Sequence, residues 1–125
     1  MLKARKIEKG SSIVALSSIS SIKGLKTKIA YAASKAAVNS AVLNMSAELA
    51  PKKIRVNAIL KGALRTDFEY GHVRDMETLG GDSSTKTELG LTEPQEVARQ
   101  CIFLLSDSVL TMTGNLLKLD GGYSL

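Results

Sequence analysis

Tyr31 and Lys35 are the two residues of this sequence best placed to do chemistry together. They lie four positions apart in the run Tyr-Ala-Ala-Ser-Lys, and in a helix that spacing puts both side chains on one face, one turn apart. A phenol ordinarily loses its proton at about pH 10, and a neighbouring ammonium stabilises the phenolate. Such a pair could therefore pass a proton to or from a bound substrate closer to neutral pH.

A hydroxyl group precedes this pair. Residues 13–16 form an apolar run typical of a short strand buried on both faces, and Ser17 and Ser18 follow it directly. Side chains alternate between the two faces of a strand, so the two serines would point in opposite directions. Serines at such positions commonly bond to nearby backbone, but Ser18 also stands thirteen positions ahead of Tyr31.

Serine, tyrosine and lysine in this order and spacing resemble the short-chain dehydrogenase/reductase family. Residues 46–59 look like that family's helix, turn and following strand, and residues 113–123 look like its last strand and closing turn. The resemblance covers nearly the whole chain. It implies an α/β fold with a partial doubly wound (Rossmann-like) parallel sheet, in which residues 1–125 form a single partial domain.

The resemblance also implies a function, that of an NAD(P)(H)-dependent oxidoreductase that interconverts an alcohol and a carbonyl by hydride transfer. It makes Ser18 the group that hydrogen-bonds the oxygen of a small-molecule substrate, and Tyr31 the acid or base that exchanges its proton. It makes Lys35 the partner of the phenol and, together with Tyr31, a contact of the cofactor. The cofactor implied is NAD or NADP.

Residues 56–66 resemble the family's loop beneath the nicotinamide, which implies that Gly62, the Leu64 backbone and the Thr66 hydroxyl hold the cofactor. One position departs from the family pattern, because Lys61 stands where members usually have proline. Proline fixes φ and removes a hydrogen-bond donor. We therefore expect Lys61 to loosen this turn and to place a charge near the cofactor.

The glycine-rich segment with which the family binds pyrophosphate has no counterpart in this sequence. The clustered glycines are Gly80 with Gly81 and Gly121 with Gly122, and neither pair opens a helix after a buried strand. We therefore expect this chain to be the C-terminal half of the family's fold. On its own, we expect it to have no dehydrogenase activity. It would act as a homo-oligomer or with a complementing N-terminal half. The alternative is a non-catalytic remnant or partner subunit that acts through its oligomer interface.

Strands and helices alternate along the rest of the chain, which predicts parallel strand pairing. We predict further strands at 55–60 and 116–119, a helix at 30–50 and the end of a helix at 1–9, with a loop over 67–90. A capping box of Thr92 and Gln95 is predicted to open another helix. The core-facing residues predicted for the two main helices are Val38, Val42, Met45 and Leu49, and Val97, Ala98, Cys101, Leu104 and Leu105.

Composition indicates an ordinary globular protein, with 44% hydrophobic and 23% charged residues. No apolar run is long enough to span a membrane, and the lone Cys101 fits a reducing compartment, so we expect a cytoplasmic protein with no membrane partner.

The charge is unevenly distributed along the sequence, with a net charge of +10 through Lys61 and of −5 from Gly62 onward. Aromatic residues for base stacking are scarce, so no nucleic-acid partner is expected. His72 has no ligand partner at metal-binding spacing, so no metal is expected.

Overall fold

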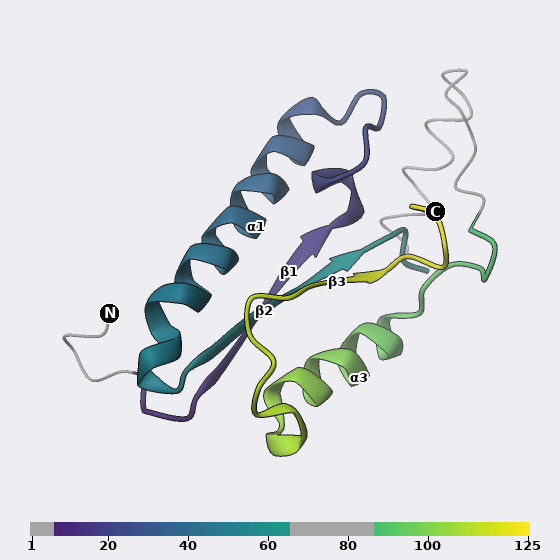
Figure 1. Cartoon of the computed structure of the whole chain (residues 1–125). Coiled ribbons are helices and arrows are strands. Elements are labelled where there is room, and N and C mark those ends of the chain that lie inside the picture. Colours follow the sequence, from purple (N-terminus) through teal and green to yellow (C-terminus); the bar gives the residue numbers. More distant parts are fainter. Residues whose placement is uncertain (1–6, 66–86) are drawn as a thin grey trace.

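The computed structural model describes residues 7–65 and 87–125. Figure 1 shows a small parallel sheet with one long helix on one face and a shorter helix on the other. In chain order the elements are β1 (Ser12–Ser18), η2 (Ile19–Ser21), α1 (Ile29–Leu49), η3 (Ala50–Lys52), β2 (Arg55–Lys61), α3 (Pro94–Leu105), η4 (Asp107–Val109) and β3 (Leu116–Leu119).

The three strands pair in parallel in the order β1-β2-β3, which confirms the predicted α/β class. Ser12 pairs with Arg55 at one end of the first ladder, and Ser18 pairs with Lys61 at the other. The ends of β2 and β3 also coincide, with Lys61 beside Leu119. The carboxyl ends of all three strands therefore meet at one edge of the sheet.

The main core lies between α1 and the sheet. Its buried members come from α1, β2 and the residue before β2: Val42, Leu49, Ile54, Val56, Ala58 and Leu60. Val42 and Leu49 are buried as predicted, while Val38 and Met45 are half-buried. Lys53 ends the connection from α1 in the left-handed region, with φ 59°, and turns the chain into β2. β2 is buried along nearly its whole length because both helices cover it.

The expectation that residues 13–16 are buried on both faces is wrong. β1 pairs with a described strand on one side only, residues 12–15 are half-buried, and Leu16 is 50% exposed. An apolar run indicates that a strand can be buried. It does not show whether another strand pairs along each of its two edges. The strand is also longer than predicted and includes Ser17 and Ser18.

The predicted start of α3 is wrong by one residue. Pro94 occupies the first turn and Glu93 is the N-cap, whose backbone N–H donates to Glu96 Oε2 at 2.7 Å. Thr92 is used elsewhere, because its hydroxyl donates to the Leu119 carbonyl at 3.4 Å. The buried stripe of this helix is also narrower than predicted: Val97 and Leu104 are buried, Cys101 is half-buried, and Ala98 and Leu105 are exposed.

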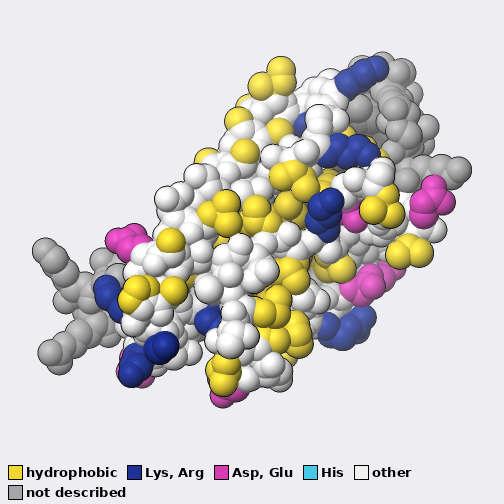
Figure 2. All heavy atoms as spheres, in the orientation of Figure 1, with side chains coloured by type: hydrophobic (Ala, Val, Ile, Leu, Met, Phe, Trp, Pro, Cys, Tyr) yellow, Lys and Arg dark blue, Asp and Glu magenta, His cyan; other side chains and the backbone are white. Residues whose placement is uncertain are grey.

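Hydrophobic side chains are exposed over α3, where they gather in Figure 2. The exposed members include Ile102, Phe103 and Leu105. At the other side of the same helix, buried Arg55 donates to the carbonyls of Leu104 and Ser106 at 2.7 and 2.9 Å. The guanidinium thus satisfies backbone acceptors at the C-terminal end of α3, where a cation is also favoured by the helix dipole.

Two predicted segments lie wholly or partly outside the described residues. Residues 1–6 and 66–86 are not described. The end of a helix was predicted at 1–9, but the described residues 7–9 are not helical. A loop was predicted over 67–90, and the described residues 87–90 form a turn and irregular chain. Within the described residues, no helix has both the length and the apolar character needed to cross a membrane.

Candidate active site

The candidate site lies where the carboxyl end of β1 meets the first turns of α1. Ser18 is the last residue of β1, and Tyr31 lies in the first turn of α1, three residues after Lys28 at the N-cap. Figure 1 shows the start of α1 beside the end of β1, with η2 and a short loop between them. Residues thirteen positions apart in sequence are therefore brought to the same edge of the sheet.

Tyr31 is 40% exposed, and within the described residues nothing bonds its phenol oxygen. Lys35 lies one turn further along α1, with its Nζ 5.7 Å from the centre of the Tyr31 ring. The same Nζ donates to the Leu16 carbonyl of β1 at 3.1 Å. This bond holds the Lys35 ammonium between α1 and the end of β1. Lys35 therefore lies on the same face of the helix as Tyr31, as predicted.

A second ammonium beside Tyr31 was missed by the sequence interpretation. Lys28 Nζ lies 6.0 Å from the centre of the Tyr31 ring. Lys28 is three positions ahead of Tyr31, and that spacing also brings side chains together on a helix. It stands at the N-cap, where no side-chain cap bond is made and where the helix dipole disfavours a cation. The preceding Thr27 adopts a left-handed φ of 65°, which is unusual for a β-branched residue.

The two serines at the end of β1 point in opposite directions, as predicted. Ser17 Oγ donates to the Lys35 carbonyl at 3.2 Å, so it faces α1. Ser18 is buried, and its Oγ accepts from the Ser20 N–H at 3.3 Å and lies 2.9 Å from Ser20 Oγ. A hydroxyl that accepts these bonds keeps its own proton for donation to a substrate oxygen.

A buried amide supports the turn that carries Ser18. Asn39 Nδ2 donates to Ser21 Oγ at 2.7 Å, and Ser21 Oγ donates to the Ser18 carbonyl at 2.5 Å. Asn39 is buried on α1, two turns after Tyr31. Nothing in its sequence context distinguished it, because asparagine in a helix is usually exposed and its contact with Ser21 depends on how the helix packs.

Gly62 and Leu64 lie just beyond β2 at the same edge. Gly62 donates its N–H to the Leu119 carbonyl at 2.8 Å, and a Cβ at this position would lie 2.8 Å from Asp120 Cα, so a side chain would not fit. Leu64 forms an isolated bridge with Thr92. The bonds of that bridge use Ala63 O and Arg65 N, and leave the Leu64 N–H and C=O without partners among the described residues. Thr66, the third predicted residue here, lies outside the described residues.

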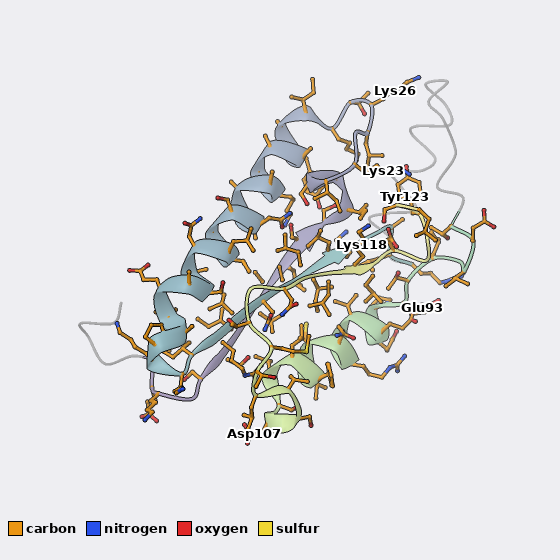
Figure 3. All side chains as sticks on the ribbon, viewed as in Figure 1. Lys23, Lys26, Glu93, Asp107, Lys118 and Tyr123 are labelled. Atoms are coloured by element: carbon orange, nitrogen blue, oxygen red, sulfur yellow. The ribbon has the colours of Figure 1, made fainter. Side chains whose placement is uncertain are left out.

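The C-terminal turn borders this edge of the sheet. Asp120 accepts from the N–H groups of Gly122 and Ser124 at 3.1 and 2.9 Å. Burial raises the pKa of the Asp120 carboxyl, but the bonds from Ser124 and Gly122, with Lys118 nearby, outweigh burial and hold the pKa below its ordinary value. Lys23 secures the same turn, since its Nζ donates to the Tyr123 carbonyl at 2.5 Å and lies 4.2 Å from the ring centre (Figure 3).

Metal-binding geometry is absent from the part of the chain that the structure describes, where no three His, Cys, Asp or Glu side chains cluster. His72 lies outside that part. Cys101 is a free, half-buried thiol on α3.

Comparison with protein families places residues 2–124 in the family model described as enoyl-(acyl carrier protein) reductase. Similar proteins include an NAD-dependent glycerol dehydrogenase from Listeria innocua, 37% identical over 117 residues, covering 93% of this chain and 45% of that protein. Another is an L-rhamnose 1-dehydrogenase (NAD(P)(+)) from Azotobacter vinelandii, 36% identical, covering 91% and 44%. The chain thus spans about half the length of the curated relatives it matches.

Solved structures show the same fold. A short-chain dehydrogenase family protein from Francisella tularensis matches with a TM-score of 0.84 and 30% identity, covering 97% of this chain and 54% of that one. A short-chain dehydrogenase from Mycobacterium paratuberculosis bound to NAD matches with a TM-score of 0.79 and 28% identity, covering 93% and 46%. ElxO with NADP bound matches with a TM-score of 0.74 and 26% identity, covering 90% and 46%.

Proposed function

The chain belongs to the short-chain dehydrogenase/reductase family, and from that premise we propose that it serves an NAD(P)(H)-dependent oxidoreductase that interconverts an alcohol and a carbonyl. The observation that carries the proposal is the grouping of Ser18, Tyr31 and Lys35 at one edge of the sheet. Tyr31 has an exposed ring, no partner for its phenol among the described residues, and the Lys35 ammonium 5.7 Å from the ring centre.

Each residue of the group has a distinct role in the proposal. Ser18 donates its hydroxyl proton to the substrate oxygen and holds it beside Tyr31, because its own acceptor positions are already used by Ser20. Tyr31 gives a proton to that oxygen during reduction and takes it back during oxidation. Lys35 stabilises the phenolate form and, with Tyr31, binds the cofactor.

The chemistry of the residues beyond β2 fits a nicotinamide carboxamide. A carboxamide has one acceptor oxygen and an NH₂ donor, and Leu64 offers one unpartnered N–H and one unpartnered C=O among the described residues. Gly62, beside them, carries no side chain, and Asp120 fills the space that a Cβ would occupy. Thr66 completes the proposed cofactor set. When bound, a nicotinamide dinucleotide supplies or accepts the hydride. Either NAD or NADP serves in the proposal.

The test uses a complemented enzyme, since the relatives are about twice as long as this chain. Fusing the N-terminal segment of the Listeria innocua relative to this chain supplies the rest of the sheet. Glycerol and L-rhamnose, with the corresponding carbonyl compounds, are the first substrates to test, and NADH and NADPH are the cofactors.

Tyr31→Phe in this fusion should lower turnover by roughly a hundredfold or more, because it removes the proton that must be exchanged. Tyr123→Phe is the matched control and should leave turnover unchanged, since Lys23 bonds the Tyr123 backbone and the ring is kept. Equal turnover in the Tyr31→Phe variant and the unsubstituted fusion would refute the role of Tyr31. A folded, cofactor-binding fusion without turnover would favour a non-catalytic partner subunit.

A further inference from the structure

Lys61 is a charged residue at the centre of the candidate site for which no described residue supplies an opposite charge. It is the last residue of β2, paired in register with Ser18 on one side and with Leu119 on the other. It is half-buried, and no described residue accepts a hydrogen bond from its ammonium.

Asp120 and Glu93, two described acids near this edge, are engaged elsewhere. Asp120 packs its Cα and Cβ against Gly62, but its carboxylate accepts from the backbone N–H groups of Gly122 and Ser124. Glu93 pairs with Arg65, with 2.5 Å between Oε1 and Nε. Between Ser18 and Tyr31 the chain carries three lysines and no acid. Among the described residues, no carboxylate forms an ion pair with Lys61.

Lys61 lies close to the backbone groups proposed to hold the nicotinamide. Only two residues separate it from Leu64, so their Cα atoms are at most about 11 Å apart. Gly62, one of those two, has no side chain and is held against β3 by its bond to Leu119. A flexible four-carbon stem lets the ammonium approach a ring bound at Leu64.

The oxidised nicotinamide ring carries a positive charge and the reduced ring carries none. An ammonium beside the ring therefore repels the oxidised form and leaves the reduced form unaffected. We infer that Lys61 makes this site bind reduced nicotinamide more tightly than oxidised nicotinamide. This inference rests on the proposed function and adds to it a preferred redox state of the bound cofactor.

The electron balance of carbonyl reduction at this site is complete. The carbonyl carbon gains a hydride from the reduced nicotinamide, the C=O π bond breaks, and the oxygen takes the proton of Tyr31. The carbonyl compound is reduced by two electrons and the nicotinamide is oxidised by two.

Binding of nicotinamide mononucleotide to the 125-residue chain tests the inference without turnover. This probe lacks the adenosine half of the dinucleotide, and its phosphate is common to the oxidised and reduced forms, so attraction of the phosphate cancels in the ratio of their dissociation constants. Titrations followed by amide NMR signals of Gly62 and Leu64 give both constants for each variant.

The unsubstituted chain should bind the reduced mononucleotide more tightly, and Lys61→Met should shrink this preference by roughly tenfold. Lys61→Arg keeps the charge and should keep the preference. Lys52→Met is the control, because Lys52 is exposed in η3, beyond the opposite end of β2. An unchanged ratio in Lys61→Met, with Leu64 still perturbed, would overturn the role of Lys61 alone. Absence of any perturbation at Leu64 would overturn the cofactor assignment and the inference together.

Discussion

At the scale of single residues, the site depends on side chains whose hydrogen-bonding groups are only partly used. Ser18 Oγ accepts from Ser20 and keeps its proton, and the Tyr31 phenol has no partner among the described residues. Two ammonium groups flank the phenol, Lys28 at 6.0 Å and Lys35 at 5.7 Å from the ring centre. Both ammonium groups lie at about the distance at which a cation is attracted to an aromatic ring.

Asn39 should be required to hold Ser18 in place. Asn39→Ala removes the donor to Ser21 Oγ, and Ser21 is the residue that bonds the Ser18 carbonyl. We expect a loss of about 1 kcal/mol or more in the free energy of unfolding, measured by urea denaturation, and shifted amide NMR signals at Ser18 and Ser20.

Asn44→Ala is the control for this prediction. Asn44 lies on the same helix but is exposed, and it bonds only to Ser40 one turn earlier. Equal stability of the two variants, with unchanged Ser18 and Ser20 signals in Asn39→Ala, would show that the buried amide does not support the turn.

At the scale of elements, the sheet and α3 are joined by a buried cation. Arg55 begins β2 and bonds the last carbonyls of α3, so the two elements share one side chain. Ser12 of β1 adds a bond to the same Leu104 carbonyl at 2.8 Å. The C-terminal end of α3 is thereby tied to the amino ends of both strands.

Arg55→Met should weaken this connection while keeping the length of the side chain. We expect the free energy of unfolding to fall by about 1.5 to 3 kcal/mol, the range for hydrogen bonds that involve a charged group. Urea denaturation measures the loss, and hydrogen exchange should locate it at the C-terminal turn of α3. Arg99→Met, an exposed arginine on the same helix, should change stability little. Equal effects of both substitutions would mean that the Arg55 bonds add nothing to stability.

Elements were predictable from sequence wherever local signals agreed with packing. β3 was predicted with its observed bounds, and α1 was displaced by only one residue at each end. The start of α3 was missed because Thr92 has a tertiary bond to Leu119, which no local pattern reveals. The exposed flank of β1 was missed for the same reason.

Some residues of the candidate site could likewise be predicted from sequence, and others could not. The spacing of Ser18, Tyr31 and Lys35 could be read from sequence, as could the opposite orientations of Ser17 and Ser18. Asn39 could not, because its role requires knowing that α1 packs on η2. Gly62 was predicted as a cofactor residue, and the structure adds that its missing side chain lets β2 approach Asp120.

At the scale of the whole molecule, β1 has one edge without a partner among the described strands. The apolar Leu16 is half exposed on that strand, and Leu43 on α1 and Phe103 on α3 are also exposed. An open edge with apolar flanks promotes association. We therefore expect the 125-residue chain, alone in solution, to form dimers or larger species, measured by sedimentation velocity.

Leu16→Lys should reduce this association, because a charge on an edge strand opposes pairing with another chain. Leu125→Lys, at the fully exposed C-terminus, adds the same charge away from the edge and should leave association unchanged. A monodisperse monomer with strongly protected amides throughout residues 12–18 would contradict the prediction, since it would show that the edge is already covered.

The parallel pairing of the strands has a consequence for the order in which the chain folds. Every residue pair between β1 and β2 spans 43 positions, as Ser12 and Arg55 do, and Ala58 pairs with Leu116 across 58 positions. No hairpin exists among these strands to start the sheet locally, and closing such long loops costs entropy before any ladder bond forms. Helix α1 forms through bonds between residues that are close in sequence. It lies between β1 and β2 in the chain. Its formation shortens the connection between β1 and β2, so we expect the helix to form first and the sheet to assemble on it.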